Sequence, residues 1–173
     1  MPPGLQKLTL TAHVTSSVGW LGAVAGFLAL AVAGLTSQDA ETVRAAYLSA
    51  ALITWFVIVP LSFASLLTGL VQSLGTQWGL FRHYWVLLKL LLTVFATIVL
   101  LVHTQPIGYM SGVAAETTLS SGDLSQQRIQ LVVASAAALW VLIVTTTLAV
   151  YKPRGLTPYG WRKRQERRTA LVP

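Results

Sequence analysis

Residues 18–35, VGWLGAVAGFLALAVAGL, form a run of the chain without one charged side chain. A helix needs about 20 mainly apolar residues to cross the hydrocarbon core of a bilayer. Three further stretches are similarly long and apolar, and the first helix is expected to begin upstream of residue 18. The predicted spans are approximately 8–35, 45–71, 84–103 and 129–151. The sequence therefore predicts an all-α, polytopic membrane protein whose four transmembrane helices form a bundle.

The composition supports lipid as the solvent for most of the chain. Of its 173 residues, 54% are hydrophobic and 10% are charged, whereas a soluble domain carries about a quarter charged residues. The mean hydropathy is +0.67. The chain has no cysteine, which excludes disulfides, thiolate metal sites and a cysteine nucleophile. The predicted division is a transmembrane domain over 1–151 and a basic tail over 152–173.

The placement of Lys and Arg predicts the orientation, because cytoplasmic loops are enriched in both. Seven of the twelve lie in the tail, and Lys7 and Arg82 fall on the same side after four crossings. Only Arg44 and Arg128 fall opposite, with four of the five acids. Both termini are therefore expected in the cytoplasm.

The connections and the tail are predicted to be irregular. Residues 104–128, rich in Ser, Thr and Gly, are expected to form an outer loop. Pro153 and Pro158 are expected to end the last helix and begin a tail without regular structure. A basic tail at a membrane exit attracts anionic lipid headgroups, so the net charge of +7 needs no nucleic-acid partner.

Few ionisable side chains lie inside the predicted spans, and such groups mark functional sites by default. His13, Trp20 and Phe27 are seven residues apart and share one helix face, as do Lys89, Ala96 and His103. Trp85 lies one turn before Lys89. The second span brings three polar side chains onto one face near its inner end: Ser65, Thr68 and Gln72. These groups are expected to converge in the inner half of the bundle.

A neutral imidazole is a common ligand of haem iron, and a bundle core holds cofactors between facing helices. The predicted ligand is His13, with Trp20 and Trp85 lining the pocket. Lys89 is expected to act as a second ligand of the iron, to pair with a haem propionate or to carry protons. Alternatively, its long side chain extends to the lipid headgroups of the inner leaflet. His103 is an alternative second ligand, although its place at the end of a predicted span favours the interface. The absence of acids inside the spans argues against a transporter with a carboxylate relay.

Two segments resemble the HemJ-type protoporphyrinogen oxidases. His13, followed by Trp20 and Gly22, is similar to the first helix of that family, and Trp85-Val-Leu-Leu-Lys89-Leu90 resembles its Trp-x-x-x-Lys-Leu segment. The resemblance implies that His13 and Lys89 act with a bound haem b, as catalytic residues if the chain is an oxidase. The copper-resistance CopD-like domains look related. The sequence of residues 65–85 is similar to that of four-span bacterial membrane proteins. This resemblance implies that the protein lies in a bacterial cytoplasmic membrane.

Two functions remain open at the level of sequence. In the first, the bundle binds haem b for electron transfer or for oxidation of a hydrophobic substrate. In the second, the chain is a non-catalytic membrane subunit or scaffold. The motif Gly22-Ala-Val-Ala-Gly26 and the Ala-rich run 134–138 favour close helix packing and a homo-oligomer.

Overall fold

Six α-helices and one π-helical turn make up nearly all of the structure. A computed structural model describes residues 2–75, 81, 83–116, 124–151 and 155–169. The elements are α1 (Pro3–Thr36), α2 (Ala40–Ile53), η1 (Thr54–Ile58), α3 (Val59–Gly75), α4 (Tyr84–Glu116), α5 (Ser125–Tyr151) and α6 (Pro158–Thr169). Within these residues no strand is present. The prediction of an all-α fold with four helices able to span a membrane is confirmed.

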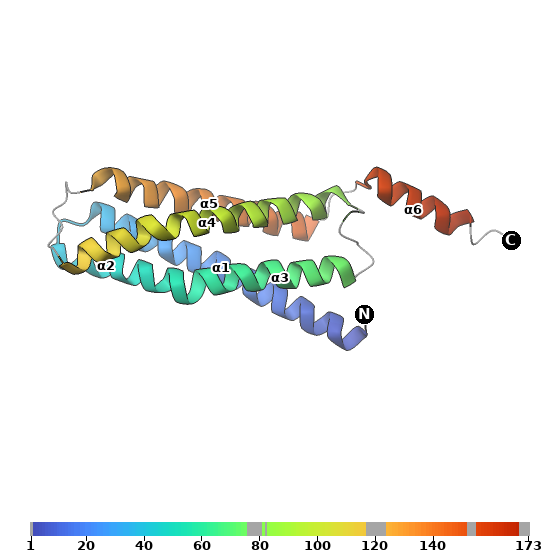
Figure 1. The fold of residues 1–173 in the computed structure, drawn as a ribbon, viewed down its shortest axis with the longest axis horizontal. Coiled ribbons are helices and arrows are strands. Elements are labelled where there is room, and N and C mark those ends of the chain that lie inside the picture. The colour runs from blue at the N-terminus through green and yellow to red at the C-terminus, as the bar shows by residue number, and fades with distance from the viewer. Residues whose placement is uncertain (1, 76–80, 82, 117–123, 152–154, 170–173) are drawn as a thin grey trace.

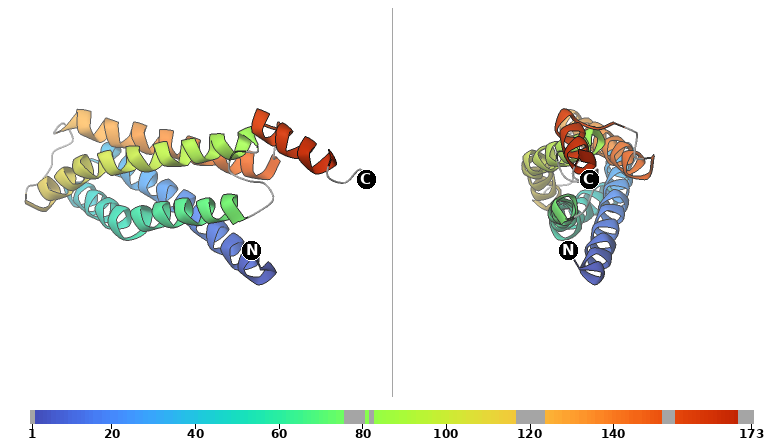
Figure 2. Two further views of the ribbon diagram at one scale, coloured as in Figure 1. Left: turned by 45° about the vertical axis from the view of Figure 1, so that its right-hand side comes forward. Right: turned by 90° about the vertical axis from the view of Figure 1, so that its right-hand side faces the viewer.

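The four long helical segments form an antiparallel bundle (Figure 1). Segment α1 packs on α5 and on the continuous segment α2–η1–α3, and α4 packs on the same two neighbours. Segments α1 and α4 therefore lie at opposite corners of the bundle. The two ends of the chain lie at one end of it, while α6 extends beyond that end and the start of α1 diverges from its neighbours (Figure 2).

The long helices extend past the hydrocarbon layer. With 34 residues, α1 is about 51 Å long at ~1.5 Å per residue, whereas the hydrocarbon core is about 30 Å thick. Large apolar side chains, among them Leu88, Phe95 and Trp140, are exposed on the outside of the bundle. This surface suits lipid rather than water.

The second transmembrane segment contains a widened turn at its middle. In η1 the Val59 amide donates to the Thr54 carbonyl, five residues earlier. The next residue, Pro60, has no amide hydrogen, and in a regular helix its ring would clash with the carbonyl of Phe56. A π-type turn accommodates such a break, and it displaces the wall of the bundle at Thr54.

Two predictions about irregular segments are wrong. Segment α4 continues as helix to Glu116 through Pro106, so residues 104–116 are not loop. Proline is tolerated in such a helix because neighbouring helices and local adjustments satisfy the freed backbone groups. The tail is helical over α6, with Pro158 as its first residue, a position that proline favours.

The residues just before α6 attach it to the segment that precedes α4. The Thr157 hydroxyl accepts from the Gly160 amide and donates to the Phe81 carbonyl, and Leu156 forms an antiparallel bridge with His83. Several residues on which the predicted orientation rests lie outside the described part of the chain: Arg82, Asp123, Lys152 and Arg154, with the side chains of Arg164, Arg167 and Arg168. Pro153, predicted to end the last helix, also lies outside it.

Candidate functional site

His13 is held against α3 through one ring nitrogen. Its Nδ1 lies 3.1 Å from the Ser65 carbonyl oxygen and 3.1 Å from Thr68 Oγ1. A carbonyl only accepts, and the Thr68 hydroxyl donates its hydrogen to the Ala64 carbonyl at 2.6 Å. Nδ1 therefore carries the hydrogen, and Nε2 of the neutral ring keeps its lone pair. A carbonyl on the far nitrogen is the usual way in which proteins orient a metal-binding imidazole.

Small residues give the His13 ring its place between α1 and α3. Ser17 Oγ lies 2.7 Å from Ser65 Oγ, which ties the same two helices together. A Cβ added to Gly69 would lie 3.0 Å from His13 Cε1, so glycine leaves the space that the ring occupies. Gln72 lies one turn beyond Thr68 and is half-buried. The predicted meeting of His13 with Ser65 and Thr68 is thus present in the structure.

Lys89 and Trp85 form a second pair on α4. Lys89 Nζ lies 5.0 Å from the centroid of the Trp85 ring, within the range of a cation–π contact. Trp85 is buried and Lys89 is half-buried. The predicted proximity of Trp85 and Lys89 on α4 is thus present in the structure.

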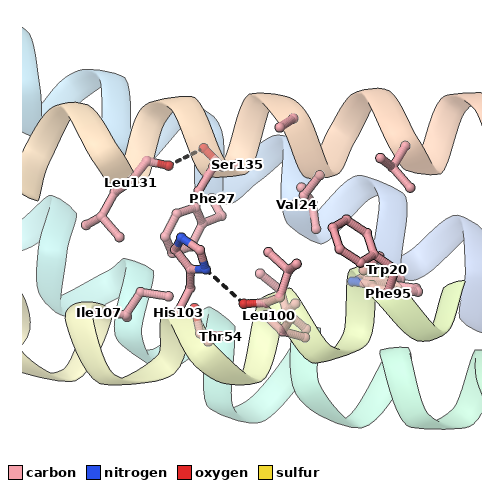
Figure 3. Close-up of a pocket in the computed structure, with 17 residues that line it drawn as sticks. Trp20, Val24, Phe27, Thr54, Phe95, Leu100, His103, Ile107, Leu131 and Ser135 are labelled. Atoms are coloured by element: carbon pink, nitrogen blue, oxygen red, sulfur yellow. Dashed lines mark hydrogen bonds between the residues drawn. The ribbon is translucent and has the colours of Figure 1, made fainter. Parts of the chain in front are cut away.

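His103 does not lie at the end of its helix, where the predicted span 84–103 places it. Because α4 continues to Glu116, His103 is in the middle of the helix, and its ring lines an interior cavity of about 140 Å³. Its Nδ1 lies 2.8 Å from the Val99 carbonyl, so this nitrogen donates and Nε2 keeps its lone pair. Figure 3 shows the ring beside Phe27 of α1. His103 therefore lies within its helix rather than at its end, on a face that lines the inside of the bundle.

The residues predicted to form one site therefore lie in two separate places. Trp20 lines the cavity with His103, whereas His13 and Lys89 are not among the described lining residues. His13 and Phe27 are about 21 Å apart along α1, so His13 and His103 do not meet. Within the described residues no three His, Cys, Asp or Glu side chains are grouped as a metal site.

The cavity at His103 is too small to hold a haem, although His103 and His13 both have a backbone carbonyl on Nδ1. An engineered cavity of about 150 Å³ binds benzene, and the cavity at His103 has nearly the same volume, about 140 Å³. It holds one ring, and a porphyrin with four pyrrole rings exceeds it in this conformation. His13 presents the orienting carbonyl that an iron ligand uses.

Sequence reasoning missed a buried cation near the opposite end of the bundle. Arg128 of α5 is 0% exposed, although it was counted only as a charge outside the spans. Its Nη1 lies 3.4 Å from the Gly34 carbonyl, and its Cζ lies 5.8 Å from the centroid of the Tyr47 ring. No spacing in the sequence singles out this contact, because it joins α1, α2 and α5.

Comparison with protein-family models, with curated proteins and with solved structures finds no match for this chain. Function is therefore inferred from the geometry of its own side chains.

Proposed function

We propose that this chain is an integral membrane protein that binds haem b in the inner half of its bundle, with His13 as an axial ligand. The observation that carries the proposal is the donation from His13 Nδ1 to the Ser65 carbonyl, at 3.1 Å. This bond fixes the tautomer whose Nε2 lone pair binds iron, and it also holds the ring in one orientation.

Lys89 and Trp85 supply the remaining chemistry. Deprotonated, the Lys89 amine would serve as a second ligand; as an ammonium it would pair with a propionate. Trp85 gives this end of the bundle a flat, buried surface. A bound haem supplies one-electron chemistry, while these residues orient it and exclude water. The proposed role is electron transfer or oxidation of a hydrophobic substrate such as a porphyrinogen.

The test is a visible spectrum of the purified protein, oxidised and reduced, after expression with a haem precursor. We expect a Soret band that shifts on reduction, and its loss in His13→Ala. Gly69→Ala should lower haem occupancy, because the new methyl would lie 3.0 Å from His13 Cε1. Gly22→Ala is the matched control, since nothing lies within 4 Å of its Cβ position. His103→Ala should keep the band.

Circular dichroism must show that each variant is folded. Lys89→Met should alter the position of the Soret band or the reduction potential, which loss of packing alone would not do. A folded, colourless wild-type preparation refutes the proposal, and so does a Soret band that is unchanged in His13→Ala.

A scaffold function is the second candidate, and one observation favours it. A Cβ added to Gly26 would lie 3.6 Å from Ile53 Cδ1 of its own bundle, whereas a Cβ added to Gly22 would meet nothing within 4 Å. Gly22 and Ala25 are exposed on the outside of α1, where a second copy has room to approach. Gly22→Leu should then weaken a dimer measured by light scattering in detergent. A monomeric wild type refutes this candidate.

The location proposed for the chain is a bacterial cytoplasmic membrane, with both termini in the cytoplasm. Trp161, Arg162 and Lys163 at the start of α6 are exposed, which suits contact with anionic lipid headgroups. Reconstitution into vesicles with and without phosphatidylglycerol should show slower tryptic cleavage of the tail when the anionic lipid is present. Equal rates refute the lipid contact.

A further inference from the structure

The cavity at His103 owes its shape to two irregular places in the helices around it. Thr54 begins the π-helical turn η1, and Ile58 ends it; both line the cavity from one side. His103 and Ile107 line it from α4, on either side of Pro106. Segment α5 faces these residues with small side chains, Ala134, Ser135, Ala137 and Ala138. The cavity therefore lies beside the π-helical turn of one segment and the proline of another, opposite a run of small residues on α5 that Leu131 and Val141 flank.

The polar atoms of the cavity leave mainly acceptors for a ligand. The Thr54 hydroxyl donates to the Ala50 carbonyl at 2.7 Å, and the Ser135 hydroxyl donates to the Leu131 carbonyl at 2.7 Å. His103 uses its one hydrogen on the Val99 carbonyl. What these three side chains offer is the lone pairs of two hydroxyls and of the imidazole Nε2.

The imidazole nitrogen is the strongest acceptor of the three, and its ring is among those that line the space. In Figure 3 the ring nitrogen that is not bonded to a carbonyl lies on the side of Phe27. Among the described lining side chains, the remaining N–H donor is the indole of Trp20, which lies farther along the bundle (Figure 3). A ligand that occupies the space beside His103 therefore satisfies the site by donating a hydrogen.

The cavity opens toward the lipid between α4 and α5. Phe95 of α4 lines it and is 60% exposed on the outside of the bundle, and Ala137 of α5 lines it and is also exposed. A molecule dissolved in the bilayer reaches the space at this seam without passing through water.

We propose that this cavity binds a single-ring aromatic alcohol, a phenol or a hydroquinone, whose hydroxyl donates to His103 Nε2. The cavity volume of about 140 Å³ limits the ligand to one ring. The apolar lining favours an apolar ligand, and the acceptor atoms require that the ligand carry a hydroxyl as a hydrogen-bond donor. The site is distinct from the proposed haem ligand His13 and does not depend on it.

The test compares 4-fluorophenol with 4-fluoroanisole by fluorine NMR on the full chain in detergent. The two rings have similar shape, but the ether cannot donate. We expect saturable binding of the phenol, about 2- to 13-fold tighter than that of the ether, since one hydrogen bond contributes roughly 0.5–1.5 kcal/mol. In His103→Leu the two affinities should become equal. His13→Ala should bind the phenol as wild type does, which separates this site from the haem proposal.

Two alanines on α5 provide a matched control for partition into the detergent. Ala134 lines the cavity, whereas Ala136 is exposed and is not among its lining residues. Ala134→Leu should abolish saturable binding, and Ala136→Leu should leave it unchanged. Equal affinity of the two ligands for the wild type overturns the proposal even if His103→Leu does not fold. Unchanged binding in Ala134→Leu, or non-saturable uptake alone, also overturns it.

Discussion

Gly34→Ala should destabilise the protein although alanine is the better helix former. The added methyl carbon would lie 2.7 Å from Cζ, 2.9 Å from Cε2 and 3.0 Å from the hydroxyl oxygen of Tyr47. Tyr47 is 2% exposed, and the Arg128 guanidinium lies over its ring at 5.8 Å. Because the ring is enclosed on both sides, it cannot withdraw without moving α2 or α5.

Two opposing effects set the size of the change. Overpacking of a close-packed interior costs about 1–3 kcal/mol, whereas replacing a helical glycine with alanine contributes about 1 kcal/mol in favour of the helix. The net loss for Gly34→Ala is therefore about 0–2 kcal/mol. Gly22→Ala, on the same helix with nothing within 4 Å of its Cβ position, gains the propensity term alone. The free energies of unfolding of the two variants should differ by about 1–3 kcal/mol.

The assay is unfolding by SDS titration in mixed micelles, followed by far-ultraviolet circular dichroism. Tyr47→Ala in the Gly34→Ala background removes the clashing ring, and the double-mutant cycle should give a coupling energy of at least about 1 kcal/mol. Tyr47→Phe keeps the ring atoms that the methyl meets and should not rescue Gly34→Ala. The reasoning is refuted if Gly34→Ala and Gly22→Ala stabilise the protein equally.

Three further outcomes are expected. Hydrogen bonds from the Thr42 hydroxyl and then from the Thr42 amide hold the pKa of the Asp39 carboxyl below its usual range. Asp39 thus stabilises the start of α2 at neutral pH and ceases to do so as the pH falls through the lowered folded-state pKa. Hydrogen exchange at the Thr42 amide should accelerate over that interval, and Asp39→Ala should remove the pH dependence. Thr157→Val removes the N-cap of α6, at a cost of about 1 kcal/mol, and tryptic cleavage of the tail should accelerate; an unchanged rate would contradict the capping role. The chain has no cysteine, so a single cysteine introduced as Ser37→Cys or Thr169→Cys reports on which side of the membrane that residue lies. A membrane-impermeant maleimide should label Ser37→Cys in intact cells and Thr169→Cys only after lysis. The reverse pattern would contradict the predicted topology.

The four spans were predictable because their signal is compositional. A run such as 18–35 has no charged side chain, and whatever its tertiary contacts, it favours lipid. The end of α4 was not predictable in this way. Residues 104–116 are richer in polar residues and glycine, and Pro106 interrupts them; these are the features of a loop in water. The helix continues because most of its backbone groups are still satisfied within it, and because Met110 and Ala114 are buried against the bundle.

Pairing within the candidate site was predictable only where helical periodicity sufficed. Ser65 and Thr68 share a face three residues apart, and the antiparallel direction of the second span brings that face to His13, which the structure shows. The burial of Arg128 depends on which helix lies beside Gly34 and on the tilt of the Tyr47 ring. Neither follows from hydropathy. A rule that counts Lys and Arg on each side of the membrane treats all of them as solvated, so it cannot detect a buried guanidinium.

The two intramembrane histidines show the same local chemistry at different depths. In both, a backbone carbonyl takes the Nδ1 hydrogen, and the neutral ring is left with an accepting nitrogen. Such a ring is suited to binding a metal or a hydroxyl. The surroundings of the two rings differ: His13 lies against a carbonyl and a hydroxyl of α3, whereas His103 lines a small, mainly apolar space. Because His13 lies about 21 Å along α1 from Phe27, which lines the cavity together with His103, no single small ligand spans both histidines. Substitutions at one histidine should therefore leave ligand binding at the other unchanged, and haem and phenol affinities measured in the same preparations test that independence.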